Sequence, residues 1–193
     1  NYTSSSSFIT LQFWIKSSVA QNFQGRVRTR QGTSYNYAFE TGSLSADTWT
    51  KITKTIPGNS NLQFDNNADK GIDIEWMMFR GTNFTDSGVT LNAWAAYASG
   101  TRTPDNTTTW YTTNDATWEI TGVQLEVGSL ATDFEHRSVA VEKRLCQRYY
   151  YNTTSSNSGY TKLIIHQNGY FQTPFTQHPV EMRAAPTITF SSV

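Results

Sequence analysis

Hydrophobic and polar residues alternate along several short stretches of the chain, which is the pattern of a β-strand with one buried face. In residues 8–16, Leu11, Phe13 and Ile15 fall on one side of the predicted strand, and polar residues such as Gln12 fall on the other. The same period returns in later segments, with Gly, Pro, Asn and Ser between them. We therefore predict further strands at residues 26–30, 35–39, 49–56, 72–76 and 89–96.

Two details refine the strand prediction. Residues 31–34, Gln-Gly-Thr-Ser, separate two of the strands and have turn chemistry, so we expect a β-hairpin there. In residues 118–127, Trp118 and Ile120 share one face, but the alternation resumes in shifted phase after Gly122. We predict one long strand with a β-bulge at that glycine.

Residues 138–150 have a helical pattern instead. Val141, Leu145 and Tyr149 follow at steps of four, and Ser138 stands where an N-cap residue is expected. We predict that this is the only substantial helix. Its apolar residues suit packing between two parts of the chain or around a three-fold axis, and the stripe is too short for a separate coiled coil. Strand-like pieces follow at residues 160–166, 170–175 and 187–193.

These patterns together predict an all-β protein. The expected architecture is an antiparallel β-sandwich of jelly-roll type, followed by one short helix and an incomplete second β unit. We place the sandwich at residues 1–137, the helical linker at 138–151 and the second unit at 152–193. The chain begins without Met and ends within a predicted strand, so we expect it to be a piece of a longer protein.

Composition supports the β prediction and narrows the functional classes. Thr and Ser occupy 29 and 19 of the 193 positions, while charged residues make up only 16%. Lys plus Arg equals Asp plus Glu at 15 each, so no strongly basic surface for nucleic acid is expected. The apolar runs are far shorter than the roughly 20 residues that cross a bilayer, so no membrane insertion is expected either.

The sequence gives little support for a metal or cofactor site. The single cysteine, Cys146, excludes an intrachain disulfide, and three scattered histidines do not form a zinc pattern. Asp65 to Gly71 places oxygens at alternate positions like a calcium loop, but the glycine comes one place late and Trp76 stands where Glu is needed. We interpret that segment as a turn and Cys146 as a small packing residue, and we expect no cofactor.

A pair of acids raises the question of glycoside hydrolysis. Asp73 and Glu75 lie two residues apart on a predicted strand, about 6.7 Å between Cα atoms, close to the carboxylate separations of glycosidases. Any exposed strand face with two acids has this spacing, and a general acid needs a pKa raised by burial. We interpret the pair as an ordinary strand surface and predict no enzymatic activity.

Sugar binding is a better match to the residue types. A sugar presents hydroxyl groups and a face of C–H bonds, so its sites combine an aromatic ring with short polar side chains. Four tryptophans, Trp14, Trp49, Trp76 and Trp118, lie in strand patterns and are expected in the core or on a sheet face. The candidate ligand-binding residues lie in loop-like sequence: Trp94, Tyr97, Asp105, Asn106, Trp110 and Tyr111.

Three stretches resemble a family of tailed-bacteriophage tail-fibre and virion-surface proteins. They are Phe8 to Arg28 with Phe-Trp-Ile-Lys, Ile120 to Tyr151 with Gly-Val-Gln-Leu-Glu and Cys-Gln-Arg-Tyr, and Met182 to Thr187 with Arg-Ala-Ala-Pro. The lead domain of that family is similar to jelly-roll carbohydrate-binding modules. In this family further strands usually precede the first stretch and a fuller β unit follows the last, so both ends look truncated. Residues 80–116 carry no part of this resemblance.

The resemblance implies a non-enzymatic virion-structural protein. Such a tail-fibre or appendage module is usually a homotrimer that is assembled in the host cytoplasm and located in the virion, where it touches host-surface polysaccharide or packs against other virion proteins. One alternative is a capsid or tail decoration protein that binds virion neighbours, which exposed apolar strips along one sheet would favour. The other alternative is a polysaccharide-degrading enzyme, which would need a cleft with paired acids.

Overall fold

The computed structural model describes residues 2–67, 69–151 and 179–185. The chain divides into two compact units, residues 1–134 and residues 135–193. This division lies three residues before the end of the predicted sandwich at residue 137. The strands predicted after the helix, at residues 160–166, 170–175 and 187–193, lie outside the described residues.

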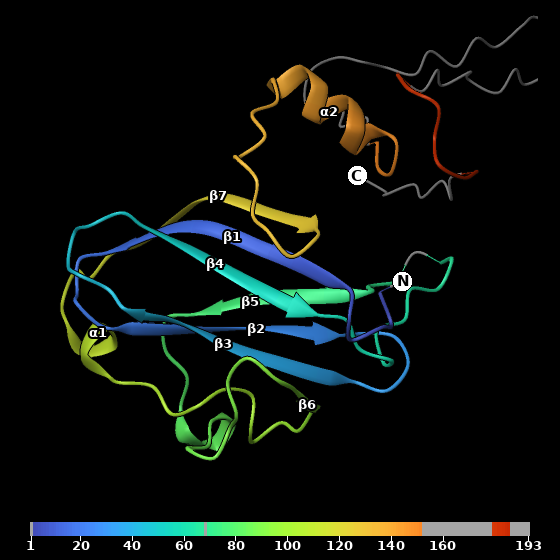
Figure 1. Ribbon diagram of the computed structural model, residues 1–193. Helices are drawn as coiled ribbons and strands as arrows, with labels where there is room; N and C mark the ends of the chain where they lie inside the picture. The colour runs from blue at the N-terminus through green and yellow to red at the C-terminus, as the bar shows by residue number, and fades with distance from the viewer. Residues whose placement is uncertain (1, 68, 152–178, 186–193) are drawn as a thin grey trace, which may run out of the picture. The chain divides into compact units, whose positions relative to one another are not determined.

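Unit 1 consists of two antiparallel sheets in two layers, as Figure 1 shows. Sheet A has the order β4 (Thr50–Pro57), β1 (Phe8–Ser17), β7 (Trp118–Val127). Sheet B has the order β5 (Ile72–Met77), β2 (Asn22–Thr29), β3 (Tyr35–Ser43), β6 (Trp94–Ala96). The all-β sandwich is thereby confirmed. The described strands number three and four, so the eight-stranded jelly roll stays a prediction.

The core lies between the two sheets and follows the alternation read from the sequence. Leu11, Phe13 and Ile15 on β1 have no exposed surface. The ring of Phe13 lies 6.3 Å from that of Phe39 on β3 and meets Trp76 on β5 edge to face at 5.4 Å. Burying a side chain of this size contributes about 1.5–3 kcal/mol each. The stripe on β1 therefore fixes which face of sheet A turns toward sheet B.

The hairpin and the bulge are both confirmed. β2 and β3 pair in antiparallel register around the predicted turn. The pairing of β1 with β7 shifts between Gln12 and Trp14, opposite Gly122, whose φ is +58°. A glycine in the left-handed region is typical of one class of bulge, because a Cβ is disfavoured there.

The strand predicted at residues 89–96 is wrong over most of its length. Only Trp94–Ala96 pairs, with β3. Before it, the Val89 N–H donates to the Asp86 carbonyl in a turn, and Asn92 has a φ of +56°. A left-handed residue interrupts the extended backbone. The apolar residues at 89–93 therefore belong to a loop.

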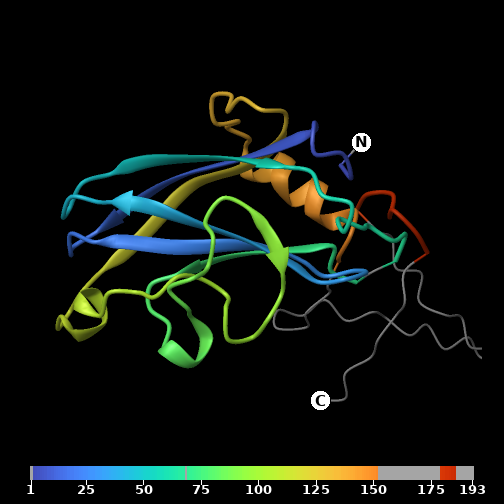
Figure 2. The same cartoon turned by 60° about the horizontal axis from the view of Figure 1, so that its bottom comes forward.

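The long connection between β5 and β7 lies on the outer side of sheet B, as Figures 1 and 2 show. It contains the 3-10 helix η1 (Thr82–Phe84), β6 and the one-turn helix α1 (Thr109–Thr112). Side chains of sheet B hold it by its backbone: Asn36 Nδ2 donates to the Arg102 carbonyl at 2.8 Å, and Gln24 Nε2 donates to the Asp105 carbonyl at 3.3 Å. The outer face of sheet B is therefore partly covered by loops.

Unit 2 contains helix α2 (Val139–Gln147), which confirms the predicted helix. Its cap is also confirmed, because the Val141 N–H donates to the Ser138 hydroxyl at 3.4 Å. Cys146 is exposed, so within the described residues its interpretation as a packing residue is wrong. No helix in the described part of the chain has the length and apolar character that a membrane crossing requires.

Candidate functional site

The six residues predicted to bind a ligand lie in different surroundings. Trp94 on β6 packs against the core, with its ring 5.4 Å from that of Tyr37. Its indole N–H donates to the Pro57 carbonyl at 2.8 Å. The side chain thus closes one end of the sandwich, and packing accounts for its contacts.

Trp110 and Tyr111 are neighbours on α1 with different environments. Trp110 packs against the core edge to face with Phe23 at 6.4 Å, and its indole N–H donates to the Thr117 carbonyl at 3.0 Å. Tyr111 is 64% exposed, and its ring stacks on that of Phe79 at 4.4 Å. Of the two, Tyr111 presents the larger surface to solvent.

Tyr97, Asp105 and Asn106 come together along the outer face of β2. Asn106 Nδ2 donates to the side-chain oxygen of Gln24 at 2.6 Å, and Asp105 accepts from the Thr85 hydroxyl at 2.6 Å. The ring of Tyr97 lies 3.5 Å from the guanidinium of Arg28. Three predicted residues, which are distant from β2 in sequence, therefore lie along its outer face.

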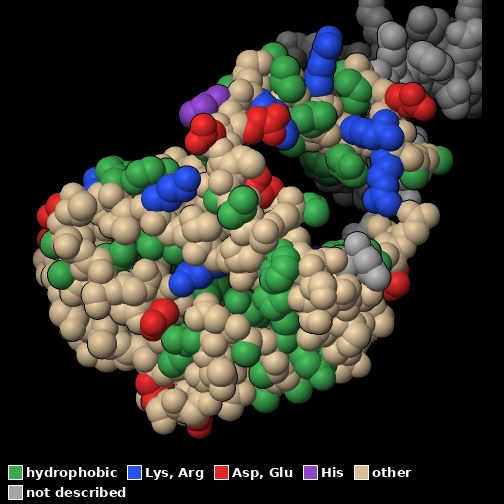
Figure 3. All heavy atoms as spheres, viewed as in Figure 1, with side chains coloured by type: hydrophobic (Ala, Val, Ile, Leu, Met, Phe, Trp, Pro, Cys, Tyr) green, Lys and Arg blue, Asp and Glu red, His purple; other side chains and the backbone are tan. Residues whose placement is uncertain are grey.

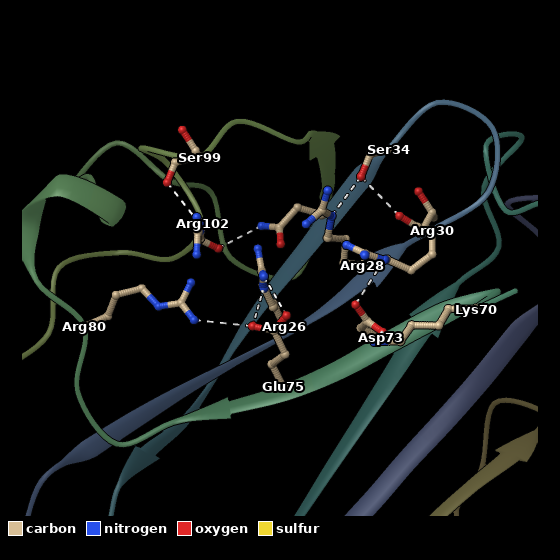
Figure 4. A network of polar contacts seen from close by, with 12 residues as sticks. Arg26, Arg28, Arg30, Ser34, Lys70, Asp73, Glu75, Arg80, Ser99 and Arg102 are labelled. Carbon is tan, nitrogen blue, oxygen red and sulfur yellow. Dashed lines mark hydrogen bonds and ion pairs between the residues drawn. The ribbon is translucent and has the colours of Figure 1, made fainter. Parts of the chain in front are cut away.

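Arginines dominate this face of β2. Arg26 and Arg28 stand at alternate positions of β2, so their side chains leave the same face of the strand, and Arg30 follows directly after the strand ends at Thr29. The sheet pairs Arg26 with Glu75 and Arg28 with Asp73 as neighbours across β5. Figure 4 shows the resulting network from close by. We call this surface, together with Arg80, Arg102 and Tyr97, the arginine face.

An ion pair between the buried Arg26 and the partly exposed Glu75 lies at its centre. Arg26 is 2% exposed, and its guanidinium donates twice to Glu75, Nη2 to Oε1 at 2.6 Å and Nε to Oε2 at 3.0 Å. Arg80 donates to the same carboxylate at 3.3 Å. Burial by itself raises the pKa of Glu75, but the hydrogen bonds and charge of Arg26, with those of Arg80, outweigh it and lower that pKa. Glu75 is therefore held as a carboxylate.

The neighbouring acid is also paired. Asp73 lies 3.2 Å from Arg30 Nε and 3.6 Å from Lys70 Nζ. A general acid for glycoside hydrolysis needs a carboxyl group that keeps its proton near neutral pH. Glu75 has the opposite environment. The arrangement of this pair suits charge compensation between strands better than proton donation.

Tyr97 lies among positive charges. Burial acts to raise the pKa of its hydroxyl, while the charges of Arg102 and Arg28 and an interaction with Arg26 lower it, and the lowering prevails. Arg102 is held in turn by the Ser99 carbonyl, which accepts from Nε at 3.1 Å, and by the ring of Phe84 at 4.5 Å. Rings and guanidinium groups thus alternate along the rim of this face.

A small cavity opens beside the arginine face. It has a volume of about 250 Å³ and is lined by residues of β3, of β6 and of the loops before and after β6, including Asn36, Asp86 and Thr101. The side-chain oxygen of Asn36 is buried and has no hydrogen-bond partner. An acceptor of this kind can accept a hydrogen bond from a ligand hydroxyl.

Exposed tryptophans also occur away from the arginine face. Trp14 on the outer face of sheet A and Trp49 just before β4 are each 40% exposed, and Lys16 Nζ lies 5.2 Å from the Trp49 ring. Trp76 and Trp118 pack against the core, which confirms the prediction for these two. Trp14 and Trp49 are sheet-face residues that remain open to solvent.

No metal site is found within the described residues, where no group of three or more His, Cys, Asp or Glu side chains could hold an ion. In the calcium-like segment, Asn67 Oδ1 accepts from Gln31 Nε2 at 2.8 Å and from the Asp69 N–H at 2.9 Å. This oxygen is therefore used for bonds within the protein. The visible face of unit 1 in Figure 3 consists mostly of backbone and uncharged polar side chains, in line with the composition.

Comparison of the chain with models of known families, with curated proteins and with solved structures finds no match. Apart from Tyr97, the residues of the arginine face were not among those that the sequence singled out. The signal of this face was present as three arginines at alternate positions of a predicted strand. Alternation alone does not distinguish an outer face that is exposed to water from one that a distant loop covers. These arginines are unusual only because the loop between β5 and β7 covers them in part.

Proposed function

We propose that unit 1 is a non-enzymatic saccharide-binding β-sandwich, and that it serves a tail-fibre or appendage protein of a tailed phage in recognising host-surface glycan. The main support is the outer face of sheet B, where the loop between β5 and β7 combines Tyr97, amide and arginine side chains, and a cavity. The phage assignment rests on the sequence resemblance. Residence in the virion and a homotrimeric state belong to the same proposal.

The residue types on this face match what a sugar offers. Amide and guanidinium groups donate hydrogen bonds to hydroxyl oxygens, and the buried oxygen of Asn36 can accept one. Aromatic rings at the rim, such as Tyr97 and the 64% exposed Tyr111, can stack on C–H faces. A cavity of about 250 Å³ is slightly below the usual range of about 300–1,000 Å³ for ligand pockets, so we expect one sugar ring at a time and weak binding by each site.

The test is a polysaccharide array probed with the full chain displayed in many copies, because multivalency raises weak affinity by orders of magnitude. We expect binding to a subset of bacterial surface glycans. Tyr97→Ala should weaken it about tenfold through loss of ring contacts. Trp49→Ala, an exposed aromatic on the other side of the sandwich, is the matched control and should bind as the wild type does. Absence of binding to every glycan, or equal loss in both variants, would contradict the proposal.

A decoration role is the second candidate, and one observation favours it. Val123, Leu125 and Val127 leave one face of the edge strand β7 and are 43%, 41% and 92% exposed. A row of apolar side chains on a sheet edge is typical of a protein contact surface. If virion neighbours or sister subunits bind there, Val127→Lys should lower the sedimentation coefficient of any assembly. An unchanged coefficient would count against this surface.

A further inference from the structure

Positive charge on the arginine face exceeds the charge of its partners. Arg26 and Arg80 share the single carboxylate of Glu75, whereas Arg28 and Arg102 form no ion pair within the described residues. Asp86 and Asp105 lie on the covering loops, but their oxygens accept from the Gly88 N–H and the Thr85 hydroxyl. Of these four guanidinium groups, two are ion-paired, and both are paired with Glu75.

Two nitrogens in this cluster are buried without a partner. Arg26 Nη1 and Arg80 Nη1 have almost no accessible surface and donate no hydrogen bond. Arg26 as a whole is 98% buried, since 2% of its surface is exposed. A buried charged donor that lacks an acceptor destabilises the fold, and native proteins rarely keep one without a use. Two such donors in the same cluster call for an acceptor between them.

The guanidinium groups converge from three separate parts of the chain. Arg26 comes from β2, Arg80 from the segment after β5, and Arg102 from the loop that covers β3. Figure 4 shows the guanidinium ends of these three side chains turned toward a common space. Their proximity also appears in the pKa of Arg80, which burial lowers and which the charges of Arg26 and Arg102 lower further, against the opposing effect of Glu75.

Each of the three is fixed in place before any ligand binds. Glu75 orients Arg26 and Arg80. The Ser99 carbonyl and the Phe84 ring orient Arg102. Preorganised donors of this kind bind an anion with little loss of side-chain freedom, and a planar guanidinium suits the oxygens of carboxylate, sulfate and phosphate groups.

We propose that Arg26, Arg80 and Arg102 bind an oxyanion that belongs to an acidic saccharide. This inference rests on the proposed function and names its ligand class: the carboxylate, sulfate or phosphate group occupies the space between the three guanidinium groups, and the sugar lies along the outer face of sheet B. The anion accepts from the two free Nη1 atoms and reduces the repulsion among three positive groups.

The test is titration calorimetry of the full chain with an oligomer of galacturonic acid and with a neutral galactose oligomer of the same length. We expect the acidic oligomer to bind at least about tenfold more tightly, with the difference shrinking as salt is added. Arg102→Gln and Arg80→Gln should each remove most of that difference, so that the affinity for the acidic oligomer approaches the affinity for the neutral one. Thermal unfolding of each variant shows whether it is folded.

Arg30→Gln is the matched control, because Arg30 directly follows the strand that carries Arg26 but is paired with Asp73. We expect its affinity for the acidic oligomer to stay within about twofold of wild type. Sulfated and phosphorylated oligomers, inorganic sulfate, and an oligonucleotide of equal charge distinguish the source of the anion. Tighter binding of any acidic saccharide than of the oligonucleotide and the free anion supports the inference.

Three outcomes would overturn it. Equal binding of acidic and neutral oligomers refutes the anion site and leaves the proposed saccharide function intact. Binding of inorganic sulfate that is lost in Arg102→Gln, with no saccharide bound at all, refutes both the acidic saccharide and the proposed function. Equal loss in Arg30→Gln and Arg102→Gln means that the effect comes from net charge, which also refutes the site.

Discussion

Burial determines how many hydrogen-bond acceptors a charged side chain needs within the protein. Arg26 and Arg30 are two positions of one alternating series, yet the side chain of Arg26 is 3% exposed and that of Arg30 is 33% exposed. The first needs a complete set of acceptors, and Glu75 supplies two of its bonds. The second shares Asp73 with Lys70 near solvent and needs less. Stability should therefore depend on Glu75 far more than on exposed acids.

Glu75→Gln should lower the free energy of unfolding by about 1–3 kcal/mol at pH 7, because it leaves buried guanidinium groups without their carboxylate. The native pKa of Glu75 is lowered, so its contribution is present above the unfolded pKa of about 4.3 and is lost as pH falls through the native value. Urea unfolding of wild type and variant at several pH values measures this. The difference should shrink below about pH 4.

Glu119→Gln is the control for this prediction. Glu119 pairs with Lys16 at 2.9 Å, but its side chain is 47% exposed, so the change should cost less than about 0.5 kcal/mol. A Glu75→Gln effect no larger than that of the control, or one that does not change with pH, would contradict the role assigned to the ion pair.

A segment outside the two sheets covers part of the outer face of sheet A. After β7 the chain turns back over the outer face of sheet A, where the Thr132 carbonyl accepts from Gln12 Nε2 at 2.7 Å. Glu126 accepts from both the N–H and the hydroxyl of Thr132, at 2.8 and 2.7 Å. This explains why Gln12, which the alternation assigns to the outer face, is 1% exposed.

Thr132→Val should detach this segment in part. Valine keeps the shape and the backbone N–H but loses the hydroxyl bonds to Glu126 and Gln124. We expect a loss of about 0.5–1 kcal/mol and faster amide hydrogen exchange at residue 132. Thr53→Val is the control, since Thr53 lies on the same face of sheet A and its side chain forms no hydrogen bond within the described residues. Equal exchange in both variants would show that the hydroxyl does not hold the segment.

At the level of the complete chain, the hydrophobic core belongs to unit 1. Every buried hydrophobic residue among the described ones lies between Leu11 and Met77. Helix α2, in unit 2, has no buried residue. The two units are therefore expected to differ in their contribution to cooperative unfolding.

A fragment of residues 1–134 should unfold cooperatively, with a midpoint within about 4 °C of the full chain, a shift that corresponds to about 1 kcal/mol for a domain of this size. Differential scanning calorimetry measures it. A fragment of residues 1–117 is the control: it lacks β7, which pairs with β1 from Ile9 to Ser17, and should not unfold cooperatively. A large loss of stability in the longer fragment would show that residues after 134 belong to the folding unit.

Local patterns were sufficient for most of the sandwich. The stripe on β1, the hairpin, the bulge at Gly122 and the Ser138 cap depend on neighbours within a few positions, so their signals are present in the residues themselves. The segment before Trp94 was misread because apolar residues occur in covered loops as well as in strands. A left-handed Asn92 has no distinct signal in a single sequence.

The candidate site could be read only in part. Tyr97, Asp105 and Asn106 were chosen for their residue types, and the fold gathers them at β2. The arginine cluster depends on pairing between β2 and β5 and on a loop more than 70 residues after Arg26. No local pattern of hydrophobic and polar residues therefore predicts it. Alternation in the chain settles which side chains leave the same face of a strand. Long-range packing alone determines which of those faces is buried, and it brings Arg80 and Arg102 to the buried Arg26 (Figure 4).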